Sequence, residues 1–103
     1  MSTATDTAQK IKISPKIDLV PPTDFKVIYV NDEVTTMEFV IESLRAVFDY
    51  SEDRAKDLCI KIHEEGSAVV AVFPYEIAEQ KGVEATHIAR QAGFPLQIKI
   101  DPE

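Results

Sequence analysis

Three polar side chains with hydrogen-bond acceptors, Asn31, Asp32 and Glu33, follow one another between an apolar run and a helix-like segment. Acceptors of this kind could hold a cationic group such as an ammonium. Asn and Asp are also common turn residues, so the triplet could simply turn the chain and lead into the helix. His63 borders the apolar stripe of a later helix and could be either a ligand-binding residue or an ordinary rim residue. The residue types alone leave both interpretations open.

Catalytic and metal-binding alternatives start from the same residues. Cys59 and His63 are four residues apart on one expected helix face and could in principle act as a nucleophile and its base. However, Cys59 belongs to the apolar stripe, where a thiol is hard to ionise. Asp32, Glu33 and His63 have the ligand types of a metal site, but their spacing matches no metal motif. We therefore expect no catalytic residue, no metal and no cofactor.

The elements that must position these residues can be predicted from periodicity and capping. Phe25–Val30 (FKVIYV) is predicted to be a strand. Thr35 and Glu38 fit a capping box, which predicts a helix from there to about Phe48. Ser51 is expected to cap a second helix that ends at Gly66.

The rest of the chain predicts a strand, a helix and a strand. Ser67–Phe73 (SAVVAVF) is a continuous apolar run of strand length. Pro74 in the first helical position would open a third helix, which ends at Ala92 before Gly93. Leu96–Ile100 (LQIKI) alternates as a half-exposed strand does. The predicted order is β-α-α-β-α-β, an α+β protein whose strand directions the pattern does not fix.

Composition and charge narrow the class of protein. The net charge is −7 over 103 residues. Residues 1–26 hold four Lys and three Asp, a net of +1, so residues 27–103 carry −8. Such an acidic body repels nucleic acid and favours cationic ligands. We expect residues 1–23 to be a flexible tail and residues 24–103 to be one folded domain. With one cysteine, no secretion signal and no bilayer-spanning stretch, we expect a cytoplasmic protein without nucleic-acid or membrane partners.

Several segments in order resemble one family. Val30–Val40 (VNDEVTTMEFV) is similar to the ClpS signature Val-Asn-Asp-Asp-x-Thr-Pro-Met-x-Phe-Val, and His63–Gly66 is similar to the family's His-x-x-Gly. Val72-Phe73, Glu76–Lys81, Ala89-Arg90 and Pro95-Leu96 also fall at family spacing. The resemblance, to an alpha-proteobacterial-like variant, extends from Lys26 to about Ile100.

The resemblance implies a small three-stranded antiparallel sheet packed against helices. It also implies a monomeric, non-enzymatic N-end rule adaptor of the ClpAP protease. Such an adaptor binds N-degron substrates that begin with Leu, Phe, Tyr or Trp and delivers them to the ClpA unfoldase. The alternative is a regulator of the unfoldase with the same fold that does not read N-terminal residues.

Site residues carried over by position fall into three groups. The free α-amino group of the substrate would be held by Asn31, Glu33 and His63, with Asp32 adding negative charge. The side-chain pocket would be lined by Thr35, Met37, Val40, Cys59, Ile62 and Leu96, with Met37 as its gate. The N-terminal domain of ClpA would contact Glu76 and Lys81.

Three positions depart from the family pattern. The second Asp of the family motif is Glu33 here, its Pro is Thr36, and a pocket position often held by a larger residue such as Met is Cys59. Glu33 moves its carboxylate outward by one methylene, and Cys59 takes volume from the pocket wall. These changes leave open which of the four first residues is preferred.

Overall fold

A computed structural model describes residues 23–103 of the chain. The predicted tail, residues 1–23, therefore lies outside the described part except for Thr23. The elements are β1 (Phe25–Val30), α1 (Met37–Phe48), α2 (Glu52–Glu65), β2 (Ser67–Phe73), α3 (Tyr75–Gln91) and β3 (Gln97–Pro102). This order confirms the predicted α+β succession.

The three strands form one antiparallel sheet in the order β2-β1-β3. β1 is central because both neighbours pair with it over its whole length, with a bulge toward β2 between Val27 and Ile28. The described chain begins and ends at the same end of the sheet, where the Glu103 amide donates to the Asp24 carbonyl at 3.1 Å. The antiparallel sheet implied by the family resemblance is confirmed.

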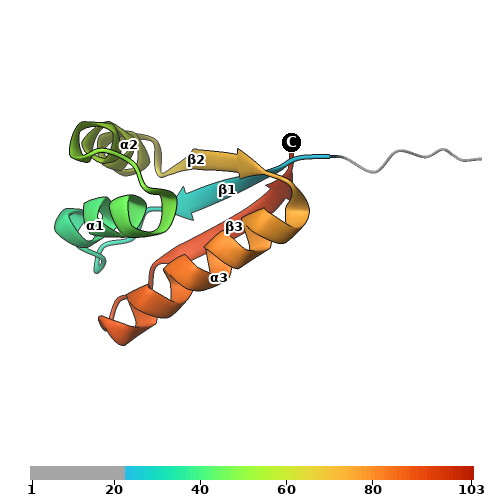
Figure 1. The fold of residues 1–103 in the computed structure, drawn as a ribbon. Coiled ribbons are helices and arrows are strands. Elements are labelled where there is room, and N and C mark those ends of the chain that lie inside the picture. Colours follow the sequence, from blue (N-terminus) through green and yellow to red (C-terminus); the bar gives the residue numbers. More distant parts are fainter. Residues whose placement is uncertain (1–22) are drawn as a thin grey trace, which may run out of the picture.

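The helices cover the sheet unequally. α3 packs along one face against all three strands, while α1 and α2 gather at the end where β1 finishes (Figure 1). α3 can lie close to the strands because it presents a row of small side chains to them, namely Ala78, Gly82, Ala85 and Ala89. At Gly82 there is little room for a side chain, since an added Cβ would lie 3.1 Å from Ile100 Cδ1 and the Ile100 side chain would have to shift by a few tenths of an ångström.

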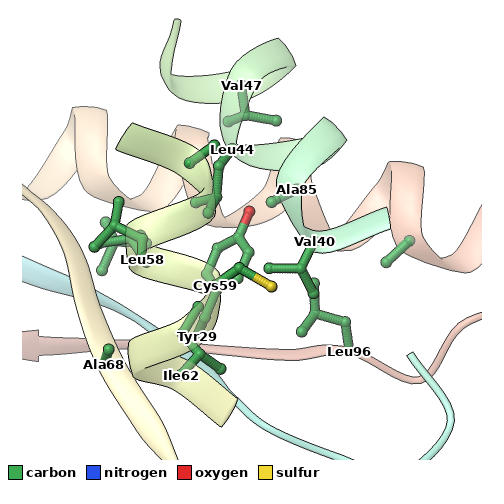
Figure 2. Close-up of a cluster of buried hydrophobic side chains, with 14 of the residues drawn as sticks. Tyr29, Val40, Leu44, Val47, Leu58, Cys59, Ile62, Ala68, Ala85 and Leu96 are labelled. Atoms are coloured by element: carbon green, nitrogen blue, oxygen red, sulfur yellow. The ribbon is translucent and has the colours of Figure 1, made fainter. Parts of the chain in front are cut away.

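The core lies between this sheet face and the helices. Val27 and Tyr29 of β1 are completely enclosed, as is Leu44 of α1. The other buried apolar side chains come from α1, α2, β2, α3 and the segment before β3, and Ile98 and Ile100 of β3 are partly buried against the core. The β1–α1 turn and the end of α2 therefore lie against a closely packed hydrophobic core (Figure 2).

Helix boundaries differ from the predictions at two places. The first helix is capped by Thr36, whose hydroxyl accepts from the Phe39 amide at 3.1 Å, so the predicted cap at Thr35 is wrong. Pro74 occupies the N-cap position of α3 and not the first helical position. The cap at Ser51 and the end at Gly66, where φ is +87°, are as predicted.

Candidate functional site

The β1–α1 turn is tied directly to the end of α2. The backbone N–H of Asn31 donates to the Gly66 carbonyl at 2.9 Å, and Gly66 ends the helix whose last turn carries His63. The side chains of Asn31, Glu33 and His63 are all exposed. Residues 30 or more positions apart in the sequence are thus brought to one end of the sheet with their acceptors facing solvent.

Asp32 organises this turn from within. One carboxylate oxygen accepts from the amides of Val34, at 2.8 Å, and Thr35, at 2.7 Å, and the other accepts from the Thr35 hydroxyl at 2.8 Å. This explains why Thr35 does not cap the helix: its hydroxyl donates to the Asp32 carboxylate inside the turn, and the next residue, Thr36, takes the N-cap position. Asp32 is an Asx-type turn residue. Because both of its carboxylate oxygens accept hydrogen bonds inside the turn, it adds negative charge to the site but few free acceptors for a ligand.

The pKa of Asp32 is lowered from its ordinary value. Desolvation is the largest single influence and raises the pKa, but three effects together outweigh it: the hydrogen bonds from Thr35, the bond from Val34 and the positive charge of Arg90. The carboxylate therefore contributes stability at neutral pH, and this contribution is lost as the pH falls through the lowered folded-state pKa.

Asp32→Asn is expected to reduce stability at pH 7 by about 1 kcal/mol, because an amide offers only one acceptor oxygen to a turn that uses two. The gap to wild type should begin to close as the pH falls below about 4, the ordinary pKa of the carboxyl, and should close fully only below the lowered folded-state pKa, where the wild-type carboxylate itself becomes protonated. Urea unfolding at a series of pH values measures this gap. Asp57→Asn, at an exposed position of α2, is the control and should run parallel to wild type. A gap that stays constant down to pH 2 would contradict this role of Asp32.

Four of the six predicted pocket residues meet inside the molecule. Val40 of α1, Cys59 and Ile62 of α2, and Leu96 before β3 are each at most 6% exposed, and Cys59 points between Val40 and Leu96 (Figure 2). The Cys59 thiol lies 3.7 Å from the Met37 carbonyl, which joins α2 to the first residue of α1. We call Val40, Cys59, Ile62 and Leu96 the apolar wall.

The other two predicted pocket residues lie nearer the surface. The Met37 side chain is 46% exposed at the start of α1, and Thr35 is half-buried in the turn. Met37 therefore contacts the apolar wall through its backbone carbonyl and exposes its side chain at the surface. Its role as the gate of the pocket stays a prediction.

A buried hydrogen-bond chain supports Val40 from below. The Ser43 hydroxyl donates to the Val40 carbonyl at 2.9 Å, so the Tyr29 hydroxyl, 2.9 Å away, must donate its proton to Ser43. Burial raises the pKa of Tyr29 to about 12 and the bond to Ser43 opposes this only in part, so the phenol stays protonated as a donor. Because each member has a partner, the first turns of α1 are held rigidly on β1.

The same geometry bears on the catalytic and metal alternatives. Cys59 is buried and burial raises the pKa of its thiol, whereas His63 is exposed on the rim. Residues 23–103 contain no cluster of three His, Cys, Asp or Glu side chains that could hold a metal ion. Neither alternative finds support in the described chain.

The two predicted partner residues on α3 differ in surroundings. Glu76 is exposed in the first turn. The Lys81 ammonium instead donates to the Val47 carbonyl at 2.9 Å, which ties α3 to the last turn of α1. Lys81 therefore has a structural role that its sequence position did not indicate.

A hollow of about 410 Å³ lies between α3 and β3 and is lined in part by Val83, Ile98 and Ile100. None of the predicted site residues lines it.

Arg90 is a contributor that the sequence analysis noted only as part of the family spacing. Its guanidinium donates to the carbonyls of Phe94, at 3.0 Å, and Leu96, at 2.8 Å. An Arg in the last turn of a helix before Gly is a signal for bonding to nearby carbonyls. That these carbonyls belong to the segment carrying a wall residue could not be seen from spacing.

The comparisons with known proteins agree on one family. Residues 20–99 match the family model of the ATP-dependent Clp protease adaptor protein ClpS. A ClpS adapter protein of Nautilia profundicola is 45% identical over 89% of this chain and 95% of its own length. ClpS 2 of Agrobacterium fabrum is 43% identical over 95% of this chain and 93% of its own.

A solved structure agrees at the level of the fold. The structure of Agrobacterium tumefaciens ClpS2 bound to L-phenylalaninamide matches with a TM-score of 0.77 and 44% identity, over 81% of this chain and all of that one. None of the helices in the described part is long and apolar enough to cross a membrane. The chain belongs to the ClpS family, the non-catalytic adaptors of the ATP-dependent Clp protease.

Proposed function

We propose that this protein binds N-degron substrates by a bulky hydrophobic first residue, Leu, Phe, Tyr or Trp, and delivers them to the ClpA unfoldase of ClpAP. The observation that carries the proposal is the hydrogen bond from Asn31 to Gly66. It joins the turn bearing Asn31 and Glu33 to the helix end bearing His63, directly beside the start of α1. We also expect the protein to be cytoplasmic and monomeric.

The chemistry of the site suits a free α-amino group. An ammonium has three donors, and an amide oxygen, a carboxylate and a neutral imidazole are acceptors for them. Each charge-assisted bond contributes about 1.5–3 kcal/mol, and the −8 charge of residues 27–103 favours a cation. Asp32 adds fixed negative charge without offering further free acceptors.

The first side chain would enter beside the apolar wall. Burying a Leu or Phe side chain contributes about 1.5–3 kcal/mol. Two or three ammonium bonds and one buried side chain give micromolar affinity, about −8 kcal/mol, after the cost of association. L-phenylalaninamide, the ligand of the Agrobacterium structure, combines a free amino group with an aromatic side chain, the same ligand chemistry.

The test is a titration of labelled peptides that differ only in their first residue. Peptides beginning with Leu, Phe, Tyr or Trp are expected to bind, and those beginning with Lys, Asp or Ser are not. Binding to the unfoldase with no preference among first residues would contradict the proposal. It would leave the regulator that does not read N-termini.

Met37→Ala is expected to raise the affinity for Val- and Ile-starting peptides about tenfold relative to Leu, because it removes the thioether that a branched Cβ would meet. Fluorescence anisotropy with Val- and Leu-starting peptides gives the ratio. Met37→Leu keeps most of the volume and should leave the ratio near that of wild type. An unchanged Val-to-Leu affinity ratio in Met37→Ala would show that Met37 does not act as the gate of the pocket.

Glu76→Lys is expected to weaken binding to the N-terminal domain of the unfoldase about fivefold, since it reverses one exposed charge at an interface. Peptide affinity should not change, and calorimetry of the two interactions separates them. Glu84→Lys reverses another exposed charge on α3 and serves as the control. Lys81 is unsuited to charge reversal because it bonds the Val47 carbonyl. If Glu76→Lys weakened both interactions, Glu76 would not belong to a separate partner surface.

A further inference from the structure

The segment between α3 and β3 is a tightly bonded turn. Gly93, with φ at +84°, ends α3 in a Schellman motif: the Phe94 amide donates to the Ala89 carbonyl at 2.9 Å, and the Gly93 amide to the Arg90 carbonyl at 3.1 Å. The Phe94 ring packs on Phe39 of α1, with ring centroids 5.0 Å apart. Backbone and ring contacts thus fix where the turn begins but leave its far end, at Leu96, to other interactions.

The far end is held by the Arg90 side chain. One guanidinium nitrogen, Nη1, donates to both the Phe94 and the Leu96 carbonyls, at 3.0 and 2.8 Å. Leu96 is 1% exposed and faces Cys59 and Val40 (Figure 2). Because the bonded carbonyl and the buried side chain belong to the same residue, the position of this part of the apolar wall depends on Arg90.

Arg90 also lines a hollow beside the β1–α1 turn. A hollow of about 510 Å³ is lined by Val34 of the β1–α1 turn together with Arg90, Gly93, Phe94 and Pro95. Val34 is bonded to the Asp32 carboxylate, and the charge of Arg90 is one of the influences that favour the ionised form of Asp32. The guanidinium therefore lies between the turn that carries the acceptors and the segment that carries Leu96.

We propose that Arg90 is a positioning residue of the candidate site: it fixes Leu96 through two carbonyl bonds and steadies the Asp32-centred turn through its charge, so that the acceptors and the apolar wall keep one mutual geometry. This proposal rests on the proposed function for its effect on peptide binding. The geometric part stands on the described contacts alone.

The test compares Arg90→Met with Arg54→Met. Methionine keeps an unbranched apolar stem and removes the charge and the donors. Arg54 is an exposed arginine of α2, nine residues before His63, whose guanidinium lies 5.7 Å from the centroid of the Tyr50 ring. Both variants lose one arginine and its local contacts, but only Arg90 touches the proposed site. Arg90→Lys is the conservative variant, which keeps the charge, but its ammonium nitrogen lies one bond closer to the backbone than the Nη1 atom that reaches both carbonyls.

Arg90→Met is expected to weaken binding of a Phe-starting peptide about tenfold, the effect of losing charged hydrogen bonds that shape the site. Arg54→Met should bind as wild type. In amide NMR spectra of the free protein, Arg90→Met should shift Val34, Thr35 and Leu96, whereas Arg90→Lys should restore Val34 and Thr35 but not Leu96. A merely structural arginine would not give this split between the effect of the charge and the effect of the bonds to the Phe94 and Leu96 carbonyls.

The outcomes separate the two proposals. A wild-type protein that ignores the first residue of peptides overturns the proposed function, while the amide shifts still decide on Arg90. Normal binding by wild type together with unchanged affinity in Arg90→Met overturns the positioning role, whether or not the amides move. Unchanged amides in the free variant overturn it as well, as does equal weakening in Arg54→Met.

Discussion

Acetylation of the N-terminus of a Leu- or Phe-starting peptide is expected to weaken its binding at least about 100-fold, the loss of two charge-assisted hydrogen bonds at about 1.5–3 kcal/mol each. Acetylation removes the positive charge and leaves a single N–H where the ammonium had three. The exposed acceptors Asn31, Glu33 and His63 would then have too few donors. Competition against a labelled peptide with free and acetylated forms of one sequence measures the effect.

Two controls make this result specific. A peptide with a free N-terminus and an acetylated internal lysine has lost the same charge elsewhere and should bind as before. Asn31→Ala should lose affinity for the free peptide but not for the acetylated one. This substitution leaves the backbone bond from residue 31 to Gly66 in place, so the turn itself persists. Equal affinity of the free and N-acetylated peptides would sink the N-degron proposal.

The sequence predicts the elements well because their signals are local. β1 and β2 have the predicted bounds, and both ends of α2 follow from its Ser and Gly caps. The cap of α1 was mispredicted because Thr35 and Thr36 are equally good caps by residue type. The choice was decided by Asp32, which takes the Thr35 hydroxyl for its own turn. The Asp32 carboxylate, three residues before Thr35, is therefore the sequence feature that distinguishes the two candidate caps.

The candidate site was harder to predict because side chains from one element hold the backbone of another segment in place. Lys81 and Arg90 each donate to a backbone carbonyl outside their own helix. The sequence pattern does not show where the charged group at the end of a long flexible side chain will lie. Cys59 and His63 illustrate a different limit. A spacing of four residues puts them on neighbouring positions of one helix, but the edge of the buried stripe passes between them, so one is enclosed and the other exposed.

Leu96→Ala is expected to cost about 2–5 kcal/mol of stability, as truncation of a fully buried leucine does. It should also weaken binding of a Leu-starting peptide, because it removes apolar surface from the wall beside Cys59 and Val40. The added space should be tolerated better by larger first residues, so the preference should shift from Leu toward Phe and Trp. Urea unfolding gives the stability, and anisotropy at low temperature gives the affinity of the folded protein.

The matched control is Leu44→Ala, because Leu44 is 0% exposed and Leu96 is 1% exposed. Both variants lose the same three methyl and methine carbons from a closed environment, so their stability losses should be similar. Leu44 lies seven residues, about two helical turns, after Met37 in α1, so its truncation should leave the Phe-to-Leu preference unchanged. If Leu96→Ala is too unstable to titrate, Leu96→Val with Leu44→Val tests the same contrast with a smaller loss. A Phe-to-Leu ratio that is the same in both members of a pair would mean that Leu96 supports the fold but does not line the pocket.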